Sequence, residues 1–402
     1  MGRLASDRKF VPSAPFSMAV VLSLWFASIG CPGMAAAEPP SADGLESLRT
    51  LAIEGKLPGK KPGETADDIS GIACMDSPSA PQMRCLVIND ENKGAQLVTL
   101  SDGRLIAGAE VPLIGDEAST TAYGTVPAGT CPGGKGKYEE LDGEGVAYAK
   151  PYFTIVASHA CTRNKQAYNP PNYLTVRIRV DDKGRIVRGD GSAPGPGDTP
   201  LSLVERTFRL GDIIKVTPSA KTALGKPLTP EENGLDIEGI AVIGGSLYAG
   251  LRAPAGKDAS GKALILRTPL APLFSSAAPE PAAAQALELA LAPETGIRDL
   301  SVLPDGRLLV LTGPAQEQDR LYGFLVFDPV TERSVTKECK LKPIPLPYDP
   351  SKPKQEYAKA EGVTVLSWRG LDAAEPSEIL VLFDGLPNGG PRVYALAPCG
   401  AP

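Results

Sequence analysis

One short phrase recurs five times along this chain, and its repetition constrains the fold more than any other feature of the sequence. Each copy begins with polar or charged residues, usually followed by a glycine, and continues as a short apolar run. The copies occupy residues 68–74, 143–148, 236–242, 296–302 and 359–365. A second apolar run follows each copy, at residues 84–89, 152–157, 246–251, 307–312 and 378–383. Short runs of this kind between turn signals are typical of β-strands.

A third run usually completes the repeat, and glycine-containing dipeptides such as Asp102-Gly103 and Asn388-Gly389 suit the hairpin turns between runs. Repeated meanders of three to four antiparallel strands predict an all-β fold, a β-propeller of five to six blades that forms a single domain over residues 66–402. A sixth blade would lie within residues 204–235, and a β-sandwich is the alternative fold. Because the last repeat has only three runs, we expect the N-terminal strand at residues 48–53 to close the ring.

The first 37 residues have the layout of a secretory signal peptide. Arg3, Arg8 and Lys9 precede an apolar run at residues 18–29, and small residues at 35–37 suit cleavage. Residues 38–65 then form a linker and the closing strand. We therefore expect a periplasmic or secreted protein without a transmembrane segment, with a lipid anchor at Cys31 as the alternative.

Six cysteines follow the leader, and an even number in an exported protein predicts disulfides. Fifteen pairings are formally open. The repeat alignment favours Cys74–Cys85, Cys131–Cys161 and Cys339–Cys399. The formal net charge of −6 argues against nucleic acid and anionic membranes as partners.

Propeller geometry predicts where the polar residues of the repeats meet. The start of each innermost strand and the end of the second strand lie at the same mouth of the central channel. Two sets of polar residues should therefore converge there. The first is Asp68, Glu144, Glu238, Arg298, Asp299 and Glu361, and the second is Asp90, Glu91, Ser158, His159, Arg252, Thr312 and Asp384.

These residue types suggest a cation site beside an anion site. Crowded carboxylates favour calcium, and the predicted metal ligands are Asp68, Asp90, Glu238, Asp299, Glu361 and Asp384. Guanidinium groups suit phosphate or carboxylate, and the predicted substrate-binding residues are Arg252, Arg298 and Arg163. His159, the sole histidine, and Glu144 are the candidates for acid–base catalysis. The structural alternative is that Glu238–Arg252 and Glu361–Arg298 are ion pairs that join blades, and that His159 only packs.

Several of these motifs also resemble a known family. The sequence is similar to a family of exported bacterial propellers catalogued as domain of unknown function 3616 at residues 68–73, 157–159, 236–241, 251–254, 296–300, 304–307, 360–363 and 382–385. The resemblance covers residues 66–397 and implies a propeller and export, without an activity. More distantly, the Glu-Gly-Ile/Val-Ala phrase is similar to phytase-like esterase propellers, which implies ester or phosphoester hydrolysis with calcium.

Two functions follow as expectations. The first is an exported propeller with a ligand site at the channel mouth that acts as a calcium-assisted ester or phosphoester hydrolase on a small-molecule or polymer ligand. The alternative is a propeller of the cell envelope that binds a protein partner or ligand without catalysis.

Overall fold

The computed structural model describes residues 44–396, apart from residues 62, 118–121, 128–130, 259–260, 278, 317, 319 and 353. The predicted signal peptide and Cys31 lie outside the described residues. Among the described residues, no helix has the length and apolar character needed to cross a membrane.

The described chain folds into five antiparallel sheets, which are the blades of a propeller. The innermost strands are β3 (Ile69–Cys74), β7 (Gly143–Ala149), β12 (Asp236–Ile243), β16 (Thr295–Val302) and β21 (Lys359–Ser367). The second strands are β4 (Gln82–Asn89), β8 (Tyr152–Ala157), β13 (Ser246–Ala253), β17 (Leu308–Pro314) and β22 (Ser377–Asp384). The third strands are β5 (Gly94–Ser101), β9 (Thr175–Val180), β14 (Lys262–Pro269), β18 (Gly323–Asp328) and β23 (Arg392–Leu396).

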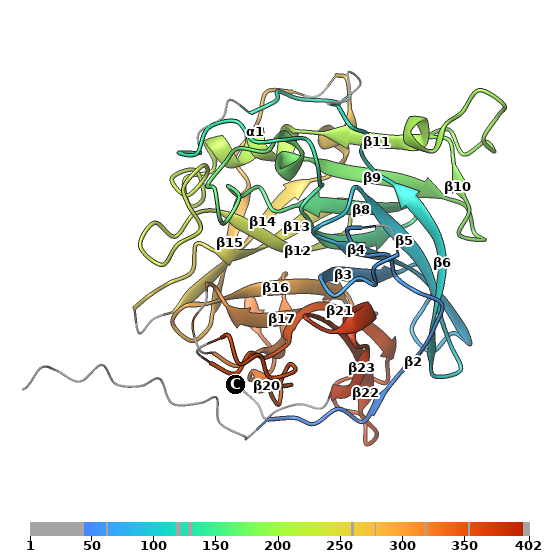
Figure 1. The fold of residues 1–402 in the computed structure, drawn as a ribbon, viewed down its shortest axis with the longest axis vertical. Coiled ribbons are helices and arrows are strands. Elements are labelled where there is room, and N and C mark those ends of the chain that lie inside the picture. Colours follow the sequence, from blue (N-terminus) through green and yellow to red (C-terminus); the bar gives the residue numbers. More distant parts are fainter. Residues whose placement is uncertain are drawn as a thin grey trace, which may run out of the picture. The chain divides into compact units, whose positions relative to one another are not determined.

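Outer strands complete the blades. They are β6 (Arg104–Pro112), β10 (Ile186–Val187), β11 (Val204–Thr207), β15 (Gln285–Ala290), β19 (Arg333–Ser334) and β20 (Cys339–Lys340). The innermost strands contact one another in the order β3, β7, β12, β16, β21 and back to β3. In Figure 1 the labelled innermost strands gather near the middle, while β6, β11 and β15 lie at the periphery. The predicted all-β propeller is therefore confirmed, with five blades.

No sixth blade forms within residues 204–235, as far as the structure describes them. Instead, β11 pairs with β9 in the second blade, and the short helix α1 (Arg209–Val216) follows it. Leu210, Ile213 and Ile214 of α1 pack into the core between the second and third blades. The longer interval between the second and third repeats is therefore a connection that packs on these blades.

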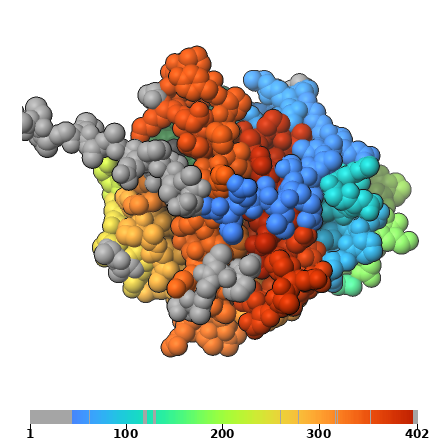
Figure 2. Space-filling view, turned by 90° about the horizontal axis from the view of Figure 1, so that it is seen from below, coloured from blue at the N-terminus to red at the C-terminus, as the bar shows by residue number. Residues whose placement is uncertain are grey.

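The N-terminal segment spans the last and first blades. Its strand β1 (Arg49–Thr50) pairs antiparallel with β23, and β2 (Ala52–Glu54) pairs parallel with β6. Figure 2 shows this segment, in blue, lying on the red surface of the last blade beside the first blade. That β1 closes and stabilises the ring stays a prediction.

Two of the predicted disulfides are confirmed, Cys74–Cys85 and Cys131–Cys161. The first joins paired positions of β3 and β4. The second joins the connection between the first and second blades to the loop that follows β8. The third predicted pair includes Cys399, which lies outside the described residues.

Candidate functional site

A β-bulge in every innermost strand places one side chain of each blade at the channel mouth. In all five strands the register with the second strand shifts and leaves one residue without a partner. These residues, which we call the ring, are Ser70, Glu144, Glu238, Arg298 and Glu361. Bulges re-aim side chains and are frequent beside functional sites. All but Ser70 are residues predicted for the site.

The glycine that follows most ring residues is required by the close approach of neighbouring innermost strands. A Cβ atom on Gly239 would lie 2.4 Å from the Cα of Asp299 in the next blade. One on Gly145 would lie 2.9 Å from the backbone nitrogen of Ile240. In the repeated Glu-Gly pair, the glycine therefore lets neighbouring strands pack closely, and the glutamate faces the channel.

Asp299 takes the place of this glycine in the fourth blade. Its Oδ1 accepts a hydrogen bond from the backbone N–H of Leu300 at 2.7 Å, and its Oδ2 accepts one from Val363 of the fifth blade at 2.7 Å. The side chain is fully buried. Because both carboxylate oxygens bind backbone N–H groups, Asp299 joins two blades and the structure does not bring it among the carboxylates that face the channel.

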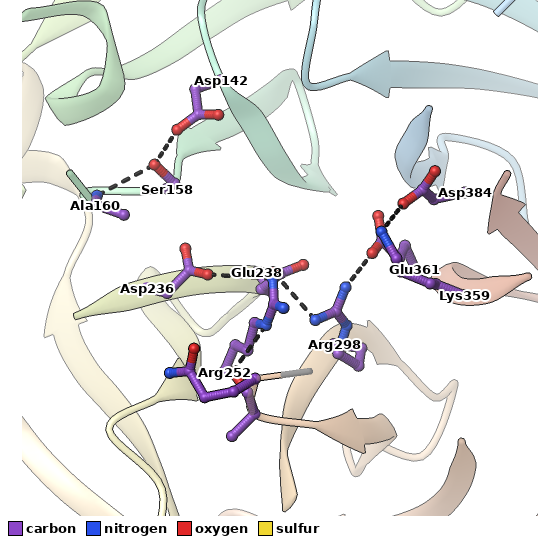
Figure 3. A network of polar contacts seen from close by, with 12 residues as sticks. Asp142, Ser158, Ala160, Asp236, Glu238, Arg252, Arg298, Lys359, Glu361 and Asp384 are labelled. Atoms are coloured by element: carbon purple, nitrogen blue, oxygen red, sulfur yellow. Dashed lines mark hydrogen bonds and ion pairs between the residues drawn. The ribbon is translucent and has the colours of Figure 1, made fainter. Parts of the chain in front are cut away.

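Blades three to five contribute a chain of buried ion pairs (Figure 3). Glu238 Oε1 lies 2.8 Å from Arg252 Nη1 and 3.3 Å from Arg298 Nη1. Arg298 also donates to Glu361, and their side chains are only 1% and 7% exposed. Arg252 additionally lies 3.5 Å from Asp236 Oδ2. The two ion pairs expected as the structural alternative are thus both present.

The same network sets the ionisation of Glu238 and Glu361 differently. Burial opposes ionisation of Glu238, but Arg298 and Arg252 together hold its pKa below the usual value. Burial raises the pKa of Glu361 to about 7, although Arg298 opposes this shift. In the fifth blade, Lys359 Nζ lies 2.6 Å from Asp384 Oδ2.

Blades one and two instead contribute carboxylates without counter-ions. These are Asp68, Asp90, Asp142 and Glu144, and none of them forms an ion pair with a residue that the structure describes. Burial, reinforced by neighbouring carboxylates, raises the pKa of Asp90 and Glu144 well above the usual range. Burial likewise raises the pKa of Asp68 to about 7 and that of Asp142 to about 6. Asp142 also accepts hydrogen bonds from Ser158 and Asn172.

Several buried polar atoms of the site have no hydrogen-bond partner among the described residues. They are Asp90 Oδ1, Asp236 Oδ1, Glu238 Oε2 and the Nε and Nη1 atoms of Arg298. Buried polar groups in native proteins are nearly always satisfied by protein or by ordered water. These atoms therefore point to a place where water, an ion or a ligand binds.

Ser70 has the shortest side chain of the ring. Because β3 contacts both β7 and β21, the neighbours of Ser70 in the ring are Glu144 of the second blade and Glu361 of the fifth. The Ser70 hydroxyl lies 3.3 Å from the carbonyl oxygen of Asp68, to which it donates. Where the other blades carry a long side chain, the first blade carries a short one between two carboxylates, and Asp90 follows the end of β4 in the same blade.

A divalent cation fits the donor set. Glu144, Glu238 and Glu361 each offer a carboxylate oxygen, and these oxygens lie within 4.8 Å of one another. Calcium binds six to eight oxygens at about 2.3–2.6 Å, so one ion could contact oxygens separated by that span. The unpartnered Oε2 of Glu238 and Oδ1 of Asp90 are independent signs of an unfilled acceptor site.

His159 lies away from the ring. Its Nδ1 is 2.8 Å from the carbonyl oxygen of Ala157, its ring packs edge-on against Tyr173 at 5.8 Å, and it is fully buried. Burial lowers the pKa of the imidazole to about 4, so it is neutral at physiological pH. These contacts describe a packing residue, and the catalytic role predicted for His159 stays a prediction.

Arg163 is exposed on the loop after β8. Burial raises the pKa of Asp142, and the positive charge of Arg163 partly offsets that rise. Arg163 therefore lies close enough to the mouth to act on charge there.

Sequence reasoning missed Asp142, Asp236 and Lys359. Each stands two residues before a ring glutamate, where the first repeat carries Asp68. Aligning the repeats column by column, rather than searching each for its most polar residue, would have found them.

A cavity of about 90 Å³ is lined by residues from all five blades. Its lining combines aliphatic side chains such as Ile72 and Val146 with polar ones such as Asp76 and Thr364. The charged groups of the innermost strands are concentrated at one end of the channel.

Comparison with solved structures finds weak likenesses. The α-L-arabinofuranosidase PaAbf62A from Podospora anserina, solved with cellotriose, is 10% identical over 86% of this chain and 95% of its own, with a TM-score of 0.39. The catalytic domain of a Coprinopsis cinerea GH62 α-L-arabinofuranosidase is 10% identical over 88% and 96%, with a TM-score of 0.39. A glucose dehydrogenase is 12% identical over 90% and 100%, with a TM-score of 0.31. At these values the likeness carries no argument about activity.

The similarity to phytase-like esterase propellers is not confirmed, and no curated protein matches the chain. Family comparison, in contrast, gives a match. Residues 206–390, which include the third and fourth blades, match the family described as "Protein of unknown function (DUF3616)", and this confirms the family resemblance expected from the sequence.

Proposed function

We propose that this chain is a divalent-cation-dependent hydrolase of ester or phosphoester bonds, with its site at the channel mouth. One observation carries the proposal: three buried glutamates from different blades, Glu144, Glu238 and Glu361, place carboxylate oxygens within 4.8 Å of one another. Such a cluster costs free energy unless protons or a cation compensate the charge. Asp68, Asp90 and Asp142 of blades one and two add to that demand.

Glu144, Glu238 and Glu361 would hold the cation, with Asp90 beside them. Arg252 and Arg298 prepare this site, because they keep Glu238 ionised before any cation binds. When bound, calcium would polarise the carbonyl or phosphoryl oxygen of the substrate as a Lewis acid. Its binding would displace the protons that Glu144 and Glu361 retain at neutral pH.

Asp68 suits the proton transfer of the reaction. Its side chain is partly exposed, Asn89 Nδ2 donates to its Oδ1 at 2.6 Å, and its pKa of about 7 lies near physiological pH. A general base is most effective when its pKa lies close to the working pH. The roles predicted from the sequence for Asp68 and Glu144 are therefore exchanged in this proposal.

Turnover of a small panel tests the proposal. The full chain is treated with chelator, and hydrolysis of p-nitrophenyl acetate, p-nitrophenyl phosphate and bis(p-nitrophenyl) phosphate is followed with and without added calcium. We expect calcium to restore turnover of at least one substrate, and Glu144→Gln to abolish it. Glu288→Gln is the matched control, because Glu288 is exposed and pairs with Lys262.

A non-catalytic binding propeller is the second candidate. The observation that favours it is the position of His159, whose described contacts leave the ring without an imidazole. Saturable calcium binding with no turnover of any substrate would support this candidate and contradict the hydrolase.

A further inference from the structure

A groove beside the channel mouth extends the candidate site across the first blade, and we propose that it binds the aliphatic acyl chain of a carboxylic ester. This inference rests on the proposed hydrolase function and specifies its substrate class. The groove has a volume of about 720 Å³. Small-molecule sites typically measure about 300–1,000 Å³, so the space suits a ligand of moderate size.

Hydrogen bonds hold the outer wall of the groove in place. This wall is residues 57–61, before β3. Leu57 N–H donates to Asn388 Oδ1 at 2.8 Å, and Asn92 Nδ2 donates to the carbonyl oxygen of Pro58 at 2.9 Å. The wall is thus tied to the last blade and to the β4–β5 connection, and the groove is a built feature of the fold.

The groove reaches the candidate site at Glu91, which lines the groove and lies close enough to Asp68 to add to the rise that burial causes in the pKa of its carboxyl. Asn89 and Glu91 line it, and they flank Asp90 in the connection after β4. Ile69, which follows Asp68 at the start of β3, lines it as well. A ligand with its reactive group beside Asp68 and Asp90 can therefore continue into the groove.

The floor of the groove is aliphatic. It is formed by Leu57, Ile69, Val87, Ile88, Ala95 and Val111. Two lysines at its rim are already paired, since Lys60 lies 3.1 Å from Glu140 and Lys93 lies 2.6 Å from Asp116. An alkyl chain would cover the apolar floor without separating these pairs from water.

The charge of the mouth favours a neutral reactive group. Asp68, Asp90, Asp142 and Glu144 have no ion-pair partner among the described residues, whereas Arg252, Arg298 and Lys359 each pair with a carboxylate. With Arg252, Arg298 and Lys359 each held by a carboxylate, these cations are not available to bind a phosphate dianion, whereas an uncharged ester needs no such partner. Charge and groove together select a carboxylic ester with an aliphatic acyl chain.

The reaction needs water as its only co-reactant. The oxygen of water forms a bond to the acyl carbon, and its proton passes to the Asp68 carboxylate. The bond between the acyl carbon and the alcohol oxygen then breaks with its electron pair on that oxygen, which takes the proton from Asp68. The products are a carboxylic acid and an alcohol, and no electron donor or acceptor is involved.

Chain length tests the inference. The full chain with calcium is assayed on p-nitrophenyl acetate, butanoate and octanoate, and kcat/KM should rise about three- to fourfold for each methylene that enters the groove. Glu110 is exposed on β6 and lines the groove, so Glu110→Trp should narrow it and lower kcat/KM for octanoate at least tenfold, with acetate unchanged. Arg104→Trp is the control, since Arg104 is exposed on the same strand but does not line the groove.

The outcomes separate the two proposals. Turnover of acetate with no dependence on chain length, or equal loss for all esters in Glu110→Trp and Arg104→Trp, would overturn the groove and leave the hydrolase standing. Absence of turnover on every ester and phosphoester would overturn the hydrolase itself. If Glu110→Trp does not fold, Lys61→Trp on the opposite wall makes the same test.

Discussion

Arg298 of the fourth blade donates to Glu361 of the fifth from the ring position at which three other blades carry a glutamate. The pair is nearly inaccessible to solvent, and Arg298 also lies 3.3 Å from Glu238. One guanidinium thus compensates two carboxylates that the propeller brings to its axis. The cation–π contact of Arg298 with Tyr322, at 5.9 Å, fixes it from the outer side.

Removing this guanidinium should destabilise the fold strongly. Arg298→Met leaves Glu361 and part of the charge of Glu238 uncompensated, and breaking a buried pair in this way typically costs about 3–5 kcal/mol. The double variant Arg298→Met/Glu361→Gln should recover part of that loss, because no buried charge is left alone at Glu361. Urea unfolding of the chelator-treated protein measures both.

The exposed pair Lys262–Glu288 supplies the control for this cycle. Its side chains are 51% and 58% exposed, so Lys262→Met should change the free energy of unfolding by no more than about 1 kcal/mol. Additive losses in the double variant would show that Arg298 and Glu361 do not act as a pair.

The ring should also make stability depend on pH. Burial raises the pKa of Glu361 to about 7, with Arg298, Asp384, Glu238 and Lys359 facing it. A carboxyl whose pKa is raised by folding binds more protons in the folded state, so its contribution is full below the ordinary pKa of 4.5 and is lost as pH rises through 7. For Glu361 this loss is roughly 3 kcal/mol.

Denaturant unfolding across this window checks the sign. Without a divalent cation the free energy of unfolding should fall as pH rises, and Glu361→Gln should flatten the slope. A wild-type profile that rises with pH, or one unchanged in Glu361→Gln, would contradict the assignment.

His159 should contribute to stability with the opposite sign. Burial lowers its pKa from 6.5 to about 4, so the unfolded chain binds the extra proton between these values. Its contribution is full above pH 6.5 and is lost as pH falls through 4. The difference in stability between wild type and His159→Asn isolates this term; asparagine suits the positive φ of 57°.

The same variant tests the predicted catalytic role. If His159 only packs, His159→Asn lowers the free energy of unfolding near neutral pH by about 1–3 kcal/mol and leaves turnover of folded protein within a few-fold. Loss of turnover by two or more orders of magnitude, with stability intact, would show instead that His159 takes part in catalysis.

The repeated phrase predicted the propeller and most of the ring because both follow from local pattern. Several blades repeat a polar residue followed by a glycine that, as at Gly239, has no room for a Cβ atom. The geometry of the blades then places these polar residues around the channel axis. The disulfide Cys74–Cys85 followed from the same register, since its residues face each other on β3 and β4.

The sequence could not predict the direction in which individual side chains point. Asp299 belongs to the repeated phrase like the ring residues, yet its oxygens bind backbone N–H groups of its own and the next blade. The positive φ at His159 gives the chain after β8 a left-handed turn there, and the imidazole packs on Tyr173 instead of joining the ring. The role of residues 204–235 was equally hidden, because α1 covers a blade through packing that no local period shows.

Calcium binding tests the central claim most directly. The melting temperature of the chelator-treated chain is followed during titration with calcium, for wild type, Glu144→Gln and the control Glu288→Gln. An ion at about a hundred times its dissociation constant adds about 2.7 kcal/mol, a rise of roughly three to four degrees for a chain of this size. We predict a saturable rise of this size in wild type and Glu288→Gln, and no rise in Glu144→Gln. Calcium-free Glu144→Gln should melt no lower than wild type, because the substitution removes a buried carboxyl that has no counter-ion. No saturable rise in wild type, or an equal rise in Glu144→Gln, would contradict a cation site in the ring.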